Sequence, residues 1–236
     1  MKAKSAMAVL ALLIGGAVAA CDMPPERAVD MPLTRTLNWF AYAGGDDIRA
    51  ACTPQGRSRI RLVYNALWEE QVRTYEVFLQ PDNTAGIATR VLADQGVVTN
   101  VLVDSAASLT GPWNTRRGER VLTRDETGEL TALLEQSAAF GPPRDGLRLP
   151  DNDFWWTVAS CRNGVWGFQA YHYPSDGFVS ARFAEKLFAF DSVQIPVNQP
   201  RQLEPAELRR DPVAQAQRDR ANRWMLVVGK DGLRPR

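Results

Sequence analysis

The feature that most restricts the fold of this chain is a two-residue turn, Asn163-Gly164, between two runs rich in aromatic and β-branched residues. Asn-Gly suits a type I′ turn, in which both central residues need positive φ, and such a turn joins neighbouring antiparallel strands. Residues 154–161 and 165–173 are therefore predicted to form a β-hairpin.

A loop of two residues also fixes the register, with Cys161 opposite Trp166 and one further pair at each outward step. The hairpin then has two faces. One face carries Cys161, Trp166, Ala159, Phe168, Thr157, Ala170, Trp155 and His172. The other carries a cross-strand aromatic set together with smaller residues, and that set is Phe154, Trp156, Tyr171 and Tyr173.

Alternation with a period of two recurs upstream of the hairpin. Ile60, Leu62 and Tyr64 alternate with arginines and other residues, a pattern typical of a half-buried strand. Similar stretches, separated by short turns, predict strands at residues 59–66, 72–79, 87–92 and 97–103. Connections this short favour antiparallel pairing over parallel crossovers.

Helical patterns follow and precede these strands. Thr123 or Asp125 begins a helix with a leucine stripe, and Asp46 or Asp47 is expected to cap a short helix over residues 48–52. Further helices are predicted at residues 180–190 and 211–223, with a last strand at 224–228. The predicted fold class is α+β: a mostly antiparallel twisted sheet of six to seven strands, two or three packing helices and a C-terminal helical arm.

The N-terminus has the layout of an export signal. Lys2 and Lys4 precede an apolar run that ends in small residues. This run is shorter than the ~20 apolar residues that a permanent transmembrane helix needs. Residues 1–20 are therefore predicted to be a signal peptide that is removed from the mature protein.

The segment Val18-Ala19-Ala20-Cys21 resembles the lipobox of bacterial lipoproteins. The resemblance implies cleavage before Cys21, a diacylglycerol on its sulfur and, in many Gram-negative bacteria, a third acyl chain such as palmitate; several acyl chains make anchoring stable. Asp22 resembles the plus-two aspartate that retains enteric lipoproteins in the inner membrane. The alternative is ordinary cleavage after Ala19 or Ala20, which would release a soluble protein.

Assigning Cys21 to lipid leaves Cys52 and Cys161 as a pair. In the oxidising periplasm a disulfide between them is expected, with two buried free thiols as the alternative. Such a disulfide would turn the Cys161 face of the hairpin toward the core. The aromatic set of the other face is then a candidate binding face if it is exposed, or core if a helix or the C-terminal segment covers it.

The charge of the chain is almost balanced but unevenly placed. Residues 201–236 carry nine basic and five acidic residues, whereas the rest of the mature chain has an acidic excess. This arm could lie on anionic lipid headgroups, dock on the acidic body, or be a solvated face. Nucleic acid is not expected as a partner, because no basic stripe is interleaved with aromatic residues.

No motif of enzymes or cofactor sites is found. His172 is the one histidine and is expected to be a packed, hydrogen-bonded residue, so no metal and no cofactor is predicted. The adjacent acids Asp46-Asp47 and Glu69-Glu70 would serve glycoside hydrolysis only beside a second, suitably spaced carboxylate. No catalytic residue is therefore assigned.

The predicted organisation is a signal peptide (1–20), an acylated cysteine with a flexible tether (21–34), a globular domain (35–200) and a basic, partly helical arm (201–236). The expected function is that of an envelope lipoprotein facing the periplasm, which acts as a non-enzymatic scaffold or binds a protein partner. Two alternatives stay open: a carrier of a small apolar or aromatic-stacking ligand, and an acid-dependent hydrolase.

Overall fold

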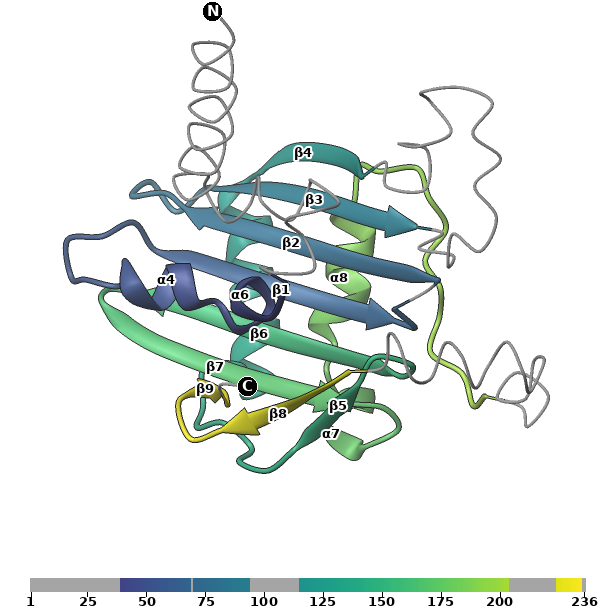
Figure 1. Cartoon of the computed structure of the whole chain (residues 1–236). Coiled ribbons are helices and arrows are strands. Elements are labelled where there is room, and N and C mark those ends of the chain that lie inside the picture. The colour runs from purple at the N-terminus through teal and green to yellow at the C-terminus, as the bar shows by residue number, and fades with distance from the viewer. Residues whose placement is uncertain (1–38, 69, 94–114, 204–223, 235–236) are drawn as a thin grey trace, which may run out of the picture.

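The computed structural model describes residues 39–68, 70–93, 115–203 and 224–234, and its centre is a six-stranded antiparallel sheet (Figure 1). The strands lie in the order β4-β3-β2-β1-β6-β7. Their bounds are β1 Arg59–Ala66, β2 Gln71–Leu79, β3 Ala85–Ala93, β4 Arg116–Leu122, β6 Phe154–Arg162 and β7 Val165–His172. The predicted α+β class with a mostly antiparallel sheet is confirmed.

Each face of this sheet is covered by a different layer. The longer helices α6 (Arg124–Gln136) and α8 (Phe183–Phe190) lie behind the sheet in the view of Figure 1. The helical residues 39–44 and α4 (Asp46–Ala50) lie in front of it. The short helix α7 (Asp176–Val179) follows β7. Because both faces are covered, the central strands are buried on both sides.

The predicted hairpin register is confirmed. Cys161 pairs with Trp166 and Trp155 with His172, around a turn in which Asn163 and Gly164 both have positive φ. A type I′ turn requires this backbone conformation, which explains how two residues set the pairing of the two strands they join.

The expectation that β1 is only half-buried is wrong. From Ile60 to Ala66 every residue of the strand is buried, including Arg61 and Asn65. The alternating pattern correctly separates two faces, but the polar face is covered by residues 39–44 and α4 rather than by water. Buried charge of this kind is stable only when it is paired.

The capping residues in the sequence predict the start of α6 correctly but not the cap of α4. α6 begins after Thr123 with a complete capping box, in which Thr123 and Glu126 each bond the other's backbone N–H. By contrast, α4 is preceded by Gly45 at φ 73° and no side chain caps it, so the prediction of Asp46 or Asp47 as its cap is wrong. Strand β4 had no alternating pattern of its own and was not predicted.

A second, three-stranded sheet joins the C-terminal residues to the domain. It has the order β5-β8-β9, with β5 at Arg148–Pro150, β8 at Met225–Gly229 and β9 at Gly232–Leu233. β8 lies close to the strand expected at residues 224–228. The strand expected at 97–103, the helix expected at 211–223 and the tether over 21–34 lie outside the described residues.

The disulfide expected between Cys52 and Cys161 is present, with the two Cα atoms 5.5 Å apart. It joins the end of the α4 segment to β6, so the layer in front of the sheet is covalently fixed to it. Among the described residues, no helix combines the length and the apolar character required to span a bilayer.

Candidate functional site

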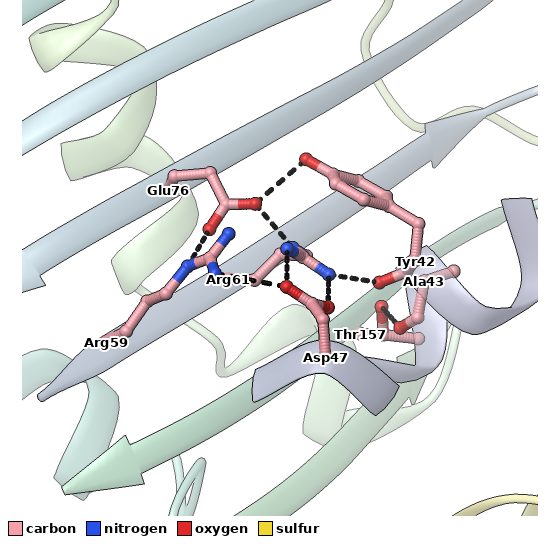
Figure 2. A network of polar contacts seen from close by, with 7 residues as sticks. All are labelled: Tyr42, Ala43, Asp47, Arg59, Arg61, Glu76 and Thr157. Carbon is pink, nitrogen blue, oxygen red and sulfur yellow. Dashed lines mark hydrogen bonds and ion pairs between the residues drawn. The ribbon is translucent and has the colours of Figure 1, made fainter. Parts of the chain in front are cut away.

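Among the described residues, several charged side chains form a buried hydrogen-bonded network between α4 and the strands β1 and β2 (Figure 2). It contains two arginines, two carboxylates and one tyrosine, namely Arg59, Arg61, Asp47, Glu76 and Tyr42. We call these five residues the ion network.

Glu76 lies at the centre of the ion network and is 1% exposed. Its Oε1 accepts hydrogen bonds from the Tyr42 hydroxyl, at 3.0 Å, and from Nε of Arg61. Its Oε2 accepts one from Nε of Arg59 at 2.8 Å. Both oxygens of this buried carboxylate therefore have donors within the protein.

Asp47 accepts hydrogen bonds from the terminal nitrogens of the same two guanidinium groups. Its Oδ1 accepts from NH1 of Arg61 at 2.7 Å, and its Oδ2 accepts from NH2 of Arg61 at 2.9 Å. NH1 of Arg59 reaches the same Oδ2 at 3.0 Å. Arg61 thus binds Asp47 through two parallel bonds, the geometry that a planar guanidinium favours.

The aromatic ring of Tyr42 closes the remaining side of Arg61. The guanidinium carbon lies 3.8 Å from the centre of this ring, and Arg61 NH1 also donates to the Tyr42 carbonyl at 2.8 Å. A cation on an aromatic face gains most when both are removed from water. Tyr42 belongs to the helical residues 39–44, so this contact ties that segment to the sheet.

The pKa values follow from this geometry. Burial alone would raise the pKa of Asp47, but the bonds and charge of Arg61 outweigh it and hold that pKa below its ordinary value. Burial, reinforced by the charge of Glu76, raises the pKa of Tyr42. Its hydroxyl therefore stays protonated and donates to Glu76. Burial and the neighbouring Asp47 raise the pKa of Asp46.

The ion network balances two positive charges with two negative ones, and each of its carboxylate oxygens accepts at least one bond. Such an arrangement holds two layers together at a defined position. It offers no unengaged carboxylate to act as general acid or base. Asp47, which the sequence suggested as a cap or as one of a pair of acids, is therefore a bridging group.

A pH test follows from Asp47. An acid with a lowered pKa in the folded state stabilises the fold above its unfolded pKa of about 3.9, and this contribution is lost as the pH falls through the folded value. We expect Asp47→Asn to lower the free energy of unfolding by about 1.5 to 3 kcal/mol at pH 7, since bonds to charged groups are lost.

The difference in the free energy of unfolding between the native protein and Asp47→Asn should be smaller at pH 3 than at pH 7, because pH 3 lies below the unfolded pKa of about 3.9 and protonation there favours the unfolded chain. Urea unfolding at pH 7 and pH 3 measures both values. Asp231→Asn is the matched control, because Asp231 is exposed and its contact with Arg49 spans 3.8 Å. A difference in the free energy of unfolding between the native protein and Asp47→Asn that is the same at pH 7 and pH 3 would contradict the role given to Asp47.

The predicted aromatic binding face lies inside the protein. Phe154, Trp156 and Tyr171 are at most 1% exposed, and Tyr173 is partly buried. Trp156 stacks on Tyr64 at 4.7 Å and meets Phe183 of α8 at 5.4 Å. The alternative in which a helix covers this set is therefore the arrangement observed.

Two of the remaining candidate residues, His172 and Glu70, have partners, whereas Glu69 lies outside the described residues. His172 Nε2 lies 2.8 Å from Oδ2 of Asp153, and Glu70 accepts from Asn198 at 2.8 Å. Within residues 39–68, 70–93, 115–203 and 224–234, no group of three or more His, Cys, Asp or Glu side chains is arranged to bind a metal ion. Cys21 lies outside these ranges.

A second charged centre lies on the opposite face of the sheet and was not predicted from the sequence. Arg73 is fully buried and pairs with Asp191, which also accepts from the Tyr75 hydroxyl at 3.2 Å. Arg73 also donates to the carbonyl of Ile195. These bonds fix the segment after α8 across the sheet. An arginine in the middle of a strand pattern is the signal that would have indicated it.

The aromatic side chains in front of the sheet form a row of four tryptophans: Trp39, Trp68, Trp224 and Trp155. Successive ring centres lie 4.8, 5.2 and 6.2 Å apart. The two ends of the row, Trp39 and Trp155, are buried, whereas Trp68 and Trp224 are partly exposed. We call these four residues the tryptophan row.

The two buried indoles of the tryptophan row differ in one hydrogen bond. Trp155 Nε1 donates to the Pro150 carbonyl at 2.7 Å, whereas Trp39 Nε1 is buried and has no hydrogen-bond partner among the described residues. Trp155→Phe should therefore cost about 1 to 3 kcal/mol more than Trp39→Phe, since both lose similar ring volume but only one breaks a bond. Urea unfolding of the two variants measures this difference, and an equal or larger cost for Trp39→Phe would contradict it.

Comparison with protein families, with curated proteins and with solved structures finds no match for this chain. The functional argument therefore depends on its own residues.

Proposed function

We propose that this protein is an envelope lipoprotein, cleaved before Cys21, acylated on that residue and retained at the inner membrane with its domain in the periplasm. The observation that carries the proposal is the division of its three cysteines. Cys52 and Cys161 are joined in a disulfide, which leaves Cys21 at the end of a Val-Ala-Ala-Cys segment. A disulfide also suits an oxidising compartment.

For the folded domain, we propose a scaffold or protein-binding role at the periplasmic face rather than a catalytic one. The arrangement of the ion network favours this role, because its carboxylates are occupied by arginines of the same chain. The burial of the aromatic face argues in the same direction, since a carrier of stacking ligands would need that face to be accessible.

Fractionation of cells that express the native protein or Cys21→Ser tests the anchor. The native protein should remain with the membrane pellet and partition into detergent, as expected for a chain with several acyl groups. Cys21→Ser should lose both properties. Cys161→Ser with Cys52→Ser is the control, since it removes the two disulfide-bonded cysteines and leaves the proposed acylation site intact. Membrane retention of Cys21→Ser would contradict the proposal.

Chemical crosslinking of the native protein in its envelope tests the binding role. A partner that crosslinks to the native protein and is lost with Cys21→Ser would support a scaffold that acts at the membrane. Turnover of a glycan or peptide by the purified domain would contradict the non-catalytic assignment.

A further inference from the structure

The tip of the β6–β7 hairpin places an exposed asparagine directly before a glycine. Asn163 has φ 52° and Gly164 has φ 78°, and the side chain of Asn163 is exposed. The backbone N–H of Asn163 donates to Oγ of Ser58 at 3.2 Å. By contrast, neither the side-chain carboxamide of Asn163 nor the N–H of Gly164 has a hydrogen-bond partner among the residues that the structure describes.

Two neighbouring groups of this kind can react with each other in water. When the Gly164 nitrogen loses its proton to hydroxide, it can attack Cγ of Asn163. The new N–Cγ bond closes a five-membered succinimide, and the Cγ–Nδ2 bond breaks to release ammonia. Water then adds to one of the two ring carbonyl carbons and opens the ring to aspartate or isoaspartate. The net change consumes one water and replaces a carboxamide by a carboxylate, without oxidation or reduction.

The glycine that permits this attack is also required by the fold. Glycine has no side chain beside its nitrogen, so nothing hinders the approach of that nitrogen to Cγ. A Cβ at position 164 would lie 2.5 Å from the nitrogen of Pro54, and the positive φ there also favours glycine. The type I′ turn therefore needs the residue that leaves Asn163 most open to attack.

Asn83 is a natural comparison within the same chain. It is also exposed and also has a positive φ, of 65°, in the β2–β3 turn. The next residue is Thr84, whose branched side chain crowds the backbone nitrogen and whose N–H donates to Oδ1 of Asp82 at 3.0 Å. The nitrogen that would attack is therefore both hindered and engaged at this turn.

We propose that Asn163 is a site of spontaneous deamidation in the folded protein and that it reacts faster than Asn83. The reaction adds a negative charge beside Arg162. Isoaspartate also routes the main chain through the former side chain, which adds a carbon atom to the backbone of a turn that sets the register of two strands. The proposal concerns the folded domain and does not depend on the lipid anchor.

Peptide mapping by mass spectrometry tests this proposal. The purified mature protein, with its disulfide intact, is kept folded at pH 7 or pH 9 and is then digested with trypsin at mildly acidic pH. The tryptic peptide that follows Arg162 contains Asn163, and the peptide between Arg73 and Arg90 contains Asn83, with no other asparagine in either. The Asn163 peptide should gain the mass of the amide-to-acid exchange several-fold faster than the Asn83 peptide. Its rate should rise from pH 7 to pH 9, because the attacking nitrogen must lose a proton.

Two variants separate the chemistry of the pair from simple exposure. Asn163→Gly leaves a Gly-Gly turn, which also suits the type I′ conformation, and should abolish the mass gain of its peptide. Thr84→Gly places a glycine after Asn83, and the Asn83 peptide should then gain mass several-fold faster than in the native protein. Circular dichroism of both variants checks that they fold.

Three results would overturn the proposal. The first is a mass gain in folded native protein that is equally fast, or faster, at Asn83. The second is an Asn163 peptide that keeps its mass in the folded protein but gains it in urea, since the turn would then block the attack. The third is a Thr84→Gly variant that folds but leaves the rate at Asn83 unchanged.

Discussion

Arg61→Ala is expected to lower the free energy of unfolding by about 3 to 5 kcal/mol, the usual cost of breaking a buried ion pair by removing one partner. Arg61 is fully buried and joins Glu76, Asp47 and the Tyr42 ring. Its removal would leave Glu76 buried, with Tyr42 and Arg59 as its remaining donors. Urea unfolding measures this change. The comparison requires that the free energy of unfolding falls with urea concentration at the same slope in both proteins.

Two further variants test the cause of this loss. Arg61→Lys keeps the charge but has no planar fork to bind Asp47 through two bonds, so its stability should fall between the native protein and Arg61→Ala. Arg49→Ala removes an exposed arginine whose contact with Asp231 spans 3.8 Å, and should cost less than about 1 kcal/mol. A loss below 1 kcal/mol for Arg61→Ala would contradict the structural role of the ion network.

Removing the disulfide should have the second large effect. The bond joins positions separated by 109 residues, and the chain-entropy account gives about 4 to 5 kcal/mol for closing a loop of this size. Cys52→Ser with Cys161→Ser should therefore lower the free energy of unfolding by about 4 kcal/mol. Urea unfolding with and without reductant measures the loss.

Reductant provides the internal control for this second prediction. It should destabilise the native protein to the level of the double variant and leave the double variant unchanged. Cys21→Ser should retain the full sensitivity to reductant, since it leaves the disulfide intact. A native protein whose stability is insensitive to complete reduction would contradict the prediction.

The sequence predicted best where a short segment determines its own geometry. Asn163 and Gly164 fix a turn through their backbone preferences, and the pairing that follows requires no knowledge of the rest of the chain. Thr123 and Glu126 likewise begin α6 by bonding each other's backbone. Such signals are local, so they survive whatever packs on them.

The prediction failed where the outcome depends on distant partners. The alternating arginines of β1 resemble a solvated face until residues 39–50 and Glu76 are placed on it. Asp47 is a residue type that often caps helices, and it lies at the start of α4. Its carboxylate nevertheless binds two arginines of β1, because hydrogen bonds between charged groups are stronger than a bond to a backbone N–H at a helix end. The exposure of the aromatic face was equally undetermined, because it depends on where α8 packs.

The tryptophan row illustrates the same limit for a cluster of side chains. Its members come from four separate parts of the chain, and of these only the hairpin stretch with Trp155 shows an aromatic pattern in the sequence. Only the folded arrangement brings a turn residue, a strand start and a helix together. The proposal of a signal peptide and a lipidated Cys21, by contrast, depends on the sequence alone.

The central claim is that Cys21 carries the lipid, whereas Cys52 and Cys161 form a disulfide with each other. Mass spectrometry of the N-terminal peptide from the mature protein, purified from its envelope, tests it most directly. The account predicts a chain that begins at position 21, with a mass increased by a diacylglyceryl group and, where a third chain is added, by a further acyl group. A mature chain with an unmodified Cys21 thiol would contradict it.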